Sequence, residues 1–272
     1  MFTYHTVEFL PPESNLPYID QQILPSEIQT HLRTKGVLRV KHSALSERTD
    51  EELVTEVTEA FNTFGSLVPQ NNQGDTIVIV QNHGEKMESG GRYHRSNQGG
   101  SIHTDGPMII AAPDLISLFC LHQGADGGDS ILVDIGAMIT KMRSVNPEAL
   151  AVLERPVWFD CKNYYGGRPA AINVPALEFT DSITLVRARF LRDYILSGYE
   201  IAGIQLPSEV KEAVNFFDSA LSDLSFSTRL RLEKGEGLLI NNRLVAHGRT
   251  AFLDGSGVTR KMVRLWYQTS WL

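Results

Sequence analysis

Residues 115–135 read LISLFCLHQGADGGDSILVDI, and this stretch decides the class of fold. Two short apolar runs, 115–121 and 130–135, are separated by a segment rich in glycine and aspartate. Runs of this length, rich in β-branched and apolar residues and bounded by turn-forming residues, predict β-strands.

More strand-like runs lie on both sides of this stretch, at 37–41, 76–81, 228–232, 237–241 and 261–268. Apolar residues at helical spacing predict helices at 26–34, 50–63, 136–144 and 208–224. Thr49 and Glu52 have the spacing of a capping box. Because short strands dominate both halves of the chain, we expect a mainly β fold with helical insertions, either a sandwich or a barrel.

We expect residues 1–272 to form a single domain. Within it, 1–74 holds the N-terminal helix and strand elements, and 136–225 is a region of helical insertion. Between them, 83–107 is a polar, glycine-rich segment, and loops as long as this one are usually functional or disordered.

Composition excludes several classes of protein. The 272 residues carry 25 Lys+Arg against 32 Asp+Glu, a formal charge of −7, which argues against a dedicated nucleic-acid binder. No apolar run is long enough to span a membrane, and the first residues lack the basic-then-apolar pattern of a signal peptide. Two cysteines, Cys120 and Cys161, are too few for a disulfide scaffold, so we expect a cytoplasmic protein.

Histidines paired with acidic residues point to a metal site. His83-x-Glu85 and His103-x-Asp105 are His-x-acid triplets, of which about one is expected by chance among 32 acidic residues in 272. On an extended chain, residues two apart point the same way, so His103 and Asp105 supply two ligands and His247 is the natural third. Two His and one carboxylate form the facial triad of non-haem Fe(II) oxygenases. Zinc accepts the same ligands, so a divalent-metal hydrolase on a cupin-like barrel stays open.

Arg260 and Arg264 favour the oxygenase. They lie four residues apart in the last predicted strand and therefore on one face of it. Arginine binds carboxylates through two parallel hydrogen bonds, so this pair suits a dicarboxylic co-substrate and a second anionic group. The alternative is a surface strand with solvated charges.

Four sequence pieces occur in the order found in one enzyme family. They are His103-Thr-Asp105-Gly-Pro, Gly127-Gly-Asp-Ser130, Asn241-Asn-Arg-x-x-x-His247-Gly-Arg249-Thr-x-Phe252 and Arg260-x-x-x-Arg264. With them the sequence resembles the Fe(II)/2-oxoglutarate-dependent dioxygenases of the taurine dioxygenase and clavaminate synthase-like family. The resemblance implies a double-stranded β-helix, the jelly-roll core of cupins.

The resemblance also implies roles for individual residues. His103, Asp105 and His247 would hold Fe(II). Arg260 and Ser130 would bind the distal carboxylate of 2-oxoglutarate. Arg264 would bind an anionic group of the prime substrate. Which of the two arginines carries the 2-oxoglutarate carboxylate stays open, with Arg249 as a third candidate, because the linker before Arg260 looks longer than in some members.

Members of this family use O2 to hydroxylate, desaturate or cyclise a small substrate, and they release succinate and CO2. The carboxylate of Asp105 argues against halogenation, in which the family replaces it by Ala or Gly. The expected substrate is small, polar and anionic, an amino acid or a derivative. The segment 83–107 is the expected lid, and Asn97 and Gln98 are its expected substrate contacts. The sequence leaves the oligomeric state open.

Overall fold

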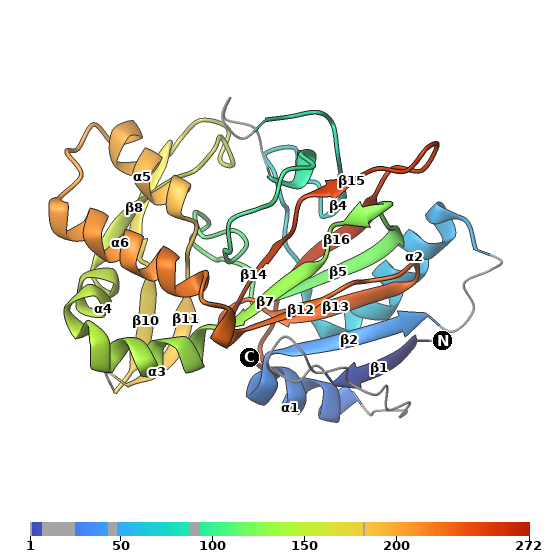
Figure 1. The fold of residues 1–272 in the computed structure, drawn as a ribbon, viewed down its shortest axis with the longest axis horizontal. Helices are drawn as coiled ribbons and strands as arrows, with labels where there is room; N and C mark the ends of the chain where they lie inside the picture. Colours follow the sequence, from blue (N-terminus) through green and yellow to red (C-terminus); the bar gives the residue numbers. More distant parts are fainter. Residues whose placement is uncertain (1, 7–24, 43–47, 87–92, 182) are drawn as a thin grey trace.

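A seven-stranded antiparallel sheet is the largest element of the computed structural model, which describes residues 2–6, 25–42, 48–86, 93–181 and 183–272 (Figure 1). Its strands follow the order β1-β2-β13-β5-β16-β3, and β4 also pairs with β16. The bounds are β1 Phe2–Thr6, β2 Val37–His42, β3 Ser66–Leu67, β4 Ile77–Gln81, β5 Leu115–His122, β13 Glu236–Asn241 and β16 Lys261–Gln268. The sequence predicts all of these strands except β1 and β3.

The two faces of this sheet pack against different cores, as β16 illustrates. Val263 and Leu265 pack with apolar residues of α1 (Pro25–Lys35) and α2 (Asp50–Phe61). Met262, on the opposite face, belongs to the core shared with the rest of the molecule. Because side chains alternate along a strand and both faces are covered, β16 is apolar on both sides rather than strictly alternating.

Helix α2 begins as the sequence predicts. The Thr49 hydroxyl accepts a hydrogen bond from the Glu52 backbone N–H at 3.2 Å, and the Glu52 carboxylate accepts one from the Thr49 N–H at 2.8 Å. This reciprocal pair is a capping box, and it satisfies two backbone donors at the exposed start of the helix.

A three-stranded antiparallel sheet, β12-β7-β14, contributes to the core that contains Met262. Its strands are β12 Ser227–Leu230, β7 Ser130–Asp134 and β14 Val245–Arg249. The pair β6 (Asp126–Gly127) and β15 (Phe252–Leu253) continues beyond the ends of β7 and β14. Strands β7 and β12 confirm the predictions at 130–135 and 228–232.

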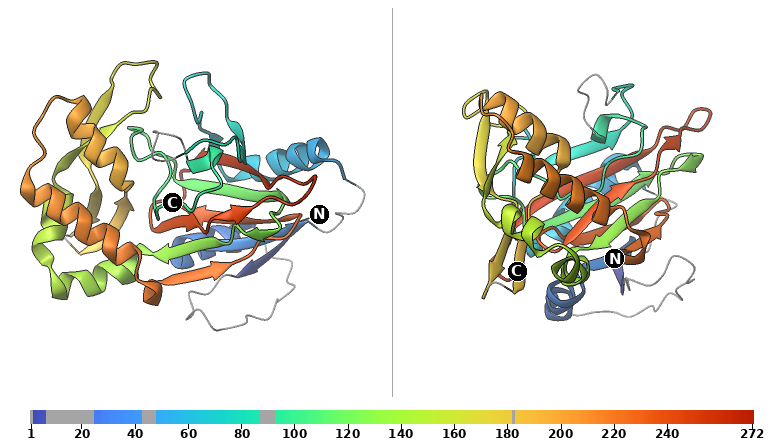
Figure 2. Two further views of the ribbon diagram at one scale, coloured as in Figure 1. Left: turned by 45° about the horizontal axis from the view of Figure 1, so that its top comes forward. Right: turned by 60° about the vertical axis from the view of Figure 1, so that its left-hand side comes forward.

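The segment from α3 to η4 (Leu224–Phe226) forms the other half of the molecule, seen on the left of Figure 1 and from two other sides in Figure 2. Its helices are α3 Ile135–Val145, α4 Pro147–Glu154, α5 Arg192–Ile201 and α6 Ser208–Leu221. Its hairpins are β8 Pro156–Asp160 with β9 Ala171–Pro175, and β10 Leu177–Thr180 with β11 Thr184–Ala188.

The expected region of helical insertion at 136–225 contains strands as well as helices. The helices at 136–144 and 208–224 are confirmed as α3 and α6, but two hairpins lie between them. These strands are only four or five residues long, and helix α5 packs against β8 and β9. A strand this short gives a weak sequence pattern, because strand formation depends strongly on its neighbours.

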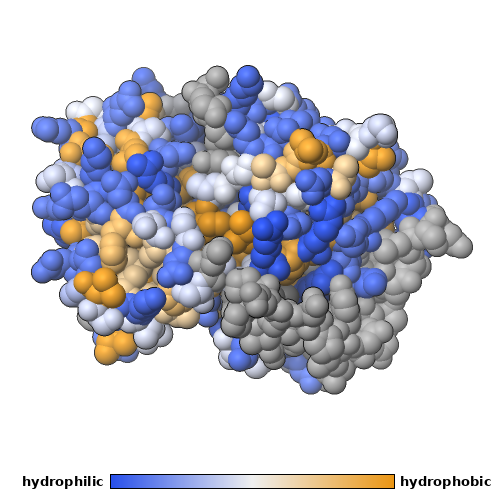
Figure 3. Space-filling view, in the orientation of Figure 1, coloured by the Kyte–Doolittle hydropathy of each residue, from blue (hydrophilic) through white to orange (hydrophobic). Residues whose placement is uncertain are grey.

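Hydrophilic side chains cover most of the face shown in Figure 3, with a group of apolar ones over α3 and α6. Two short 3-10 turns, η1 (Asn62–Phe64) and η3 (Tyr93–Arg95), complete the elements. Within the described ranges, no helix combines the length and the apolar character that crossing a membrane requires.

Candidate functional site

A reciprocal backbone pair brings His103 and His247 together. The N–H of His103 donates to the carbonyl of His247 at 2.9 Å, and the N–H of His247 donates to the carbonyl of His103 at 2.8 Å. Residues directly opposite one another in an antiparallel pair project to the same face. The two imidazole rings accordingly lie with their centroids 4.7 Å apart.

Asp105 completes the cluster. Its position is fixed by Asn242, whose side-chain oxygen accepts from the Asp105 N–H at 2.8 Å and whose amide nitrogen donates to the Asp105 carbonyl at 2.9 Å. One ligand atom from each of His103, Asp105 and His247 lies within 4.8 Å of the other two. Ser101 accepts a hydrogen bond through its carbonyl from Nδ1 of His103 at 2.8 Å, which leaves Nε2 to face Asp105.

The Asp105 carboxylate is held from behind by two donors. Nη1 of Arg264 lies 3.2 Å from each carboxylate oxygen, and the indole N–H of Trp266 donates to Oδ2 at 2.8 Å. Burial by itself raises the pKa of Asp105, but the Arg264 guanidinium, the His103 hydrogen bond and the His247 imidazole together outweigh burial and hold this pKa well below its usual range. Asp105 is therefore ionised at neutral pH.

His247 is neutral at neutral pH, because burial lowers its pKa to about 3 despite the attraction of Asp105. A neutral imidazole and an ionised carboxylate are the states that bind metals. Nδ1 of His247 is buried and has no hydrogen-bond partner in the described part of the chain. Two imidazoles and one carboxylate in a cluster of this size fit a divalent transition metal.

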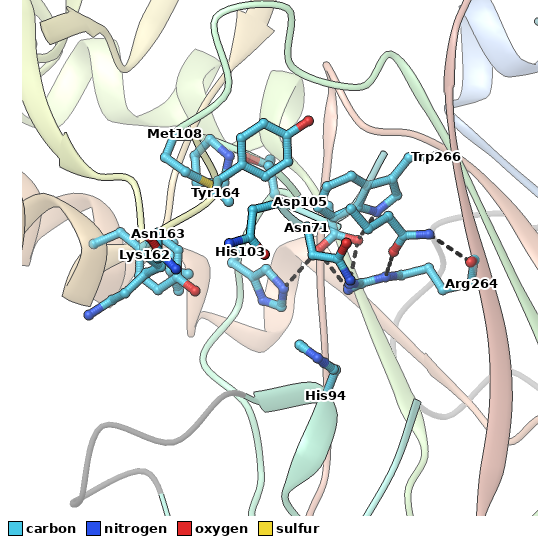
Figure 4. A pocket seen from close by; sticks show the side chains of 17 residues that line it. Asn71, His94, His103, Asp105, Met108, Lys162, Asn163, Tyr164, Arg264 and Trp266 are labelled. Carbon is cyan, nitrogen blue, oxygen red and sulfur yellow. Dashed lines mark hydrogen bonds and ion pairs between the residues drawn. The ribbon is translucent and has the colours of Figure 1, made fainter. Parts of the chain in front are cut away.

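Two cavities meet at this cluster, and both are lined by His94, His103 and Arg264. We call the first the arginine cavity; its other lining residues include Ser130, His247, Arg249, Arg260 and Met262. We call the second the amide cavity; its other lining residues include Gln70, Asn71, Asn72, Asp105, Lys162, Asn163, Tyr164, Tyr194 and Trp266 (Figure 4).

Arg260 is the most unusual residue of the arginine cavity, because a fully buried guanidinium meets only neutral acceptors. Its exposed fraction is 2%, and its nitrogens donate to the side-chain oxygen of Gln123 at 3.1 Å and to the carbonyl of Gly128 at 3.3 Å. Among the described residues, no carboxylate forms an ion pair with it. Burial lowers its pKa to about 10, so it stays charged at neutral pH. Such a cation fits an anionic ligand.

Gly128 makes this arrangement of Arg260 feasible. Its φ is +75°, and a Cβ there would lie 2.8 Å from Nε of Arg260. Only glycine combines that backbone conformation with so close an approach.

Ser130 and Arg249 face each other across the β7–β14 pair, and both line the arginine cavity. The Arg249 guanidinium donates to the carbonyl of Gln98 at 2.6 Å and to the carbonyl of Ser96. The Arg249 guanidinium therefore holds residues 96–98 in place. The Arg260 guanidinium lines the cavity and, among the described residues, has no carboxylate partner.

Arg264 lies in both cavities but is already engaged. Besides Asp105, it donates through Nε to the side-chain oxygen of Gln70 at 2.8 Å, and its guanidinium carbon lies 4.8 Å from the centre of the Trp266 ring. Arg264 therefore orients both the Asp105 carboxylate and the side-chain amide of Gln70.

One known protein family matches nearly the whole chain. Residues 7–266 match the family described as "Taurine catabolism dioxygenase TauD, TfdA family". The chain belongs to the TauD/TfdA dioxygenase family. The resemblance carried by the four sequence pieces is thereby confirmed.

Curated relatives differ in the length of chain that they share with this protein. FR-33289 synthase from Streptomyces rubellomurinus is 27% identical over 210 residues, which cover 75% of this chain and 60% of that protein. Gamma-butyrobetaine dioxygenase from a Pseudomonas species is 30% identical over 157 residues, 57% of this chain and 40% of that protein. The chain thus spans less than two thirds of the length of these relatives.

Solved structures share the fold of this chain. Asparagine oxygenase, determined with Fe(II), 3-hydroxyasparagine and succinate, superposes with a TM-score of 0.71 at 14% identity, over 90% of this chain and 80% of that one. The non-haem iron oxygenase OrfP, determined with Fe and α-ketoglutaric acid, gives a TM-score of 0.64 at 15% identity, over 91% and 81%.

Two predicted substrate contacts lie away from both cavities. The carbonyl of Asn97 accepts from the N–H of Phe252 at 3.1 Å, and the carbonyl of Gln98 accepts from Arg249. Neither residue lines the amide cavity or the arginine cavity. Their backbone fastens 96–103 along 247–252, so this part of the expected lid is anchored, and residues 87–92 of that lid lie outside the described residues.

The amide cavity contains residues that the sequence does not single out. Gln70, Asn71 and Asn72 follow β3, and Lys162 and Asn163 lie in the loop between β8 and β9. The polar residues 70–72, which follow β3, are a weak signal in the sequence for a binding site. The loop at 162–163 gives none, because no spacing rule links it to His103.

Proposed function

We propose that this chain is an Fe(II)- and 2-oxoglutarate-dependent oxygenase that hydroxylates a small, polar, anionic substrate of the amino-acid type. The observation that carries the proposal is a cluster of two histidines and a carboxylate at the junction of two cavities, one of which contains the buried Arg260. A metal, a dicarboxylic co-substrate and a substrate each have a compartment of suitable chemistry.

His103, Asp105 and His247 would hold the iron. The His103–His247 backbone pair and the Asn242 amide fix these ligands before any metal binds, so little conformational freedom is lost on binding. When bound, Fe(II) would supply the O2 activation that couples conversion of 2-oxoglutarate to succinate and CO2 with insertion of one oxygen atom into a substrate C–H bond.

Arg260 and Ser130 would bind the distal carboxylate of 2-oxoglutarate in the arginine cavity. The guanidinium contributes charge and two parallel donors, and the Ser130 hydroxyl contributes one more donor. Of the arginines considered from the sequence, Arg260 is favoured because Arg249 is engaged by backbone carbonyls and Arg264 by Asp105.

The prime substrate would occupy the amide cavity, where side-chain amides orient polar groups and Arg264 contributes a positive charge. Relatives support an amino-acid type of substrate. The asparagine oxygenase structure holds 3-hydroxyasparagine, and an OrfP structure holds hydroxy-arginine. Hydroxylation is the outcome that these products favour over desaturation or cyclisation.

We also propose that the two main sheets form a double-stranded β-helix, the jelly-roll core expected from the sequence, and that 1–272 forms one domain. The two cores both include residues of β5, β13 and β16, which supports a single folding unit. A cytoplasmic location agrees with the two buried, unpaired thiols of Cys120 and Cys161.

A zinc hydrolase could use the same three ligands, but it has no need of a buried cation in a separate cavity. Arg260 therefore favours the oxygenase. The two functions differ in their response to 2-oxoglutarate, and this difference defines the experiment.

The test is an anaerobic titration of the protein with Fe(II) and 2-oxoglutarate, followed by visible absorption and by calorimetry. We expect a weak absorption band that requires both additions, disappears in His103→Ala and needs more 2-oxoglutarate in Arg260→Ala. Tight metal binding without this band in the wild type, together with no effect of Arg260→Ala, would reject the oxygenase and favour the hydrolase.

A further inference from the structure

The loop between β8 and β9 has an unusual backbone at the wall of the amide cavity. Lys162 and Asn163 have φ values of +46° and +63°, so two consecutive residues other than glycine adopt the left-handed conformation. Such residues persist only where their surroundings fix them, and they gather at binding and active sites. The same two residues line the amide cavity.

Contacts from three elements hold this loop in place. Asp160 accepts the Lys162 N–H through Oδ1 at 2.8 Å, while its Oδ2 lies 2.8 Å from Nζ of Lys162. Ser197, on α5, donates to the same Oδ2 at 2.9 Å. Across the cavity, the Tyr164 hydroxyl donates to the carbonyl of Pro69 at 3.0 Å, next to the amide of Gln70.

These contacts fix the Lys162 ammonium at the cavity wall. Its Nζ lies 5.3 Å from the centre of the Tyr194 ring, and its side chain is 34% exposed. In Figure 4, Lys162 and Asn163 lie on one side of His103, and Arg264 and Asn71 lie on the other. The cavity therefore places cations on both sides of the metal cluster, with side-chain amides beside each.

Arg264 and Lys162 have different partners. Arg264 is bonded to Asp105 and Gln70, so it shapes the cluster itself. Lys162 pairs with Asp160, which is not among the residues that line the cavity. A substrate group that reaches this wall meets a positioned ammonium beside the amide of Asn163.

We propose that Lys162 determines substrate specificity by binding an oxyanion group, a carboxylate or a phosphate, at the end of the substrate remote from Arg264. The inference rests on the proposed function and adds the position of the substrate's second polar end. An acidic amino acid or amino-acid derivative has the required chemistry, whereas its uncharged analogue brings no negative charge to the ammonium, which then keeps its Asp160 partner. A site built for a charged hydrogen bond rejects such analogues strongly.

The experiment measures binding of three matched pairs to the anaerobic Fe(II)–2-oxoglutarate protein by calorimetry and by the change in its visible absorption. The pairs are L-aspartate with L-asparagine, L-glutamate with L-glutamine, and O-phospho-L-serine with L-serine. We expect wild-type protein to bind the acid of at least one pair on the order of tenfold tighter than its neutral partner. Preference within the first two pairs identifies a carboxylate, and preference within the third identifies a phosphate.

Substitutions test the role of the residue. Lys162→Met and Lys162→Gly should both remove the preference for the acid, and Lys162→Arg should retain it. Lys162→Gly tolerates the left-handed backbone, so a loss in this variant reports charge rather than strain. The control is Lys141→Met, because Lys141 also pairs with one carboxylate, Asp223 at 3.8 Å, and lies 5.2 Å from an aromatic ring centre, that of Phe226.

The outcomes separate the two proposals. A wild-type protein that forms the Fe(II)–2-oxoglutarate band but prefers no acid, or whose preference survives Lys162→Met, overturns the role of Lys162 and leaves the oxygenase standing. A wild-type protein that forms no band overturns the proposed function and this inference with it.

Discussion

The arginine cavity and the amide cavity meet at His103, yet they are built from different kinds of structure. Strand residues of β5, β7, β14 and β16 line the arginine cavity, and each strand is held by hydrogen bonds to its neighbours. Loops at 70–72, 104–108 and 162–164, together with α5, line most of the amide cavity. Loops tolerate change that strands do not. Under the proposed function, the comparison places the metal and co-substrate site on the sheets and the substrate specificity on the loops.

The largest effect is expected at the junction of the two cavities. His247→Ala removes a proposed iron ligand but keeps the backbone pair with His103. We expect iron affinity to fall by more than about 100-fold, since groups outside the coordination sphere already cost 10–100-fold. Metal titration by calorimetry measures this, with His83→Ala, from the other His-x-acid triplet, as the control. Equal losses in both variants would contradict the assignment.

Arg260 should dominate the arginine cavity. Arg260→Ala removes the buried cation, and we expect 2-oxoglutarate affinity to fall on the order of 100-fold, because truncating one partner of a buried charge pair is costly. Iron affinity should change little, since Arg260 touches no metal ligand. Arg229→Ala, at an exposed arginine paired with Asp129, serves as the control. A similar loss there would mean that general charge, not the cavity, attracts the co-substrate.

Gly128→Ala tests whether the strand-built wall is rigid. The added Cβ would lie 2.8 Å from Nε of Arg260, so the guanidinium must shift. We expect a loss of about tenfold in 2-oxoglutarate affinity, measured by calorimetry, since misplacing a binding group by an ångström is costly. Gly74→Ala matches it in backbone strain, with φ +89° against +75°, but its Cβ meets nothing within 4 Å. If Gly74→Ala weakens 2-oxoglutarate binding as much, steric displacement is not the cause.

Alkylation of the two cysteines compares the mobility of the β8–β9 loop with that of the central strand β5. Burial raises the pKa of Cys161 to about 11 and that of Cys120 to about 12, so at pH 8 neither buried thiol is reactive and alkylation reports opening. Cys161 lies at the base of the β8–β9 loop, whereas Cys120 lies in the central strand β5. We expect iodoacetamide to label Cys161 at least about tenfold faster, measured by mass spectrometry. Equal labelling in urea is the control, and faster labelling of Cys120 in the folded protein would reverse the comparison.

Tyr164→Phe gives the smallest effect. It removes the hydrogen bond from the β8–β9 loop to the carbonyl of Pro69, worth about 0.5–1.5 kcal/mol. We expect Cys161 labelling to accelerate by roughly threefold to tenfold while 2-oxoglutarate affinity stays unchanged. A change in 2-oxoglutarate affinity instead would show that the two cavities are mechanically coupled.

Local patterns predicted most of the fold. Helix α2 with its capping box and five of the seven strands of the large sheet were readable, because apolar spacing and caps act within a few residues. The hairpins β8–β9 and β10–β11 were not, because their short strands depend on packing against helices from other parts of the chain.

For the site, the sequence by itself predicted the three residues that the structure brings into one cluster, and it predicted the arginine pair proposed to bind the co-substrate and the substrate. His103 and Asp105 lie two residues apart on an extended segment, so backbone geometry predicts that they point the same way. Arg260 directly precedes β16, and the pairing of β16 with β5 shifts register between Lys261 and Met262, so strand alternation alone does not fix the position of Arg260 relative to Arg264. Only the tertiary structure decided how each is used. Arg264 reaches back to Asp105 while Arg260 meets neutral acceptors, and Asn97 and Gln98 fasten the chain while Lys162 faces the cavity. The physical reason is distance along the chain: charge pairing and cavity walls depend on residues brought together from distant segments, which local spacing does not encode.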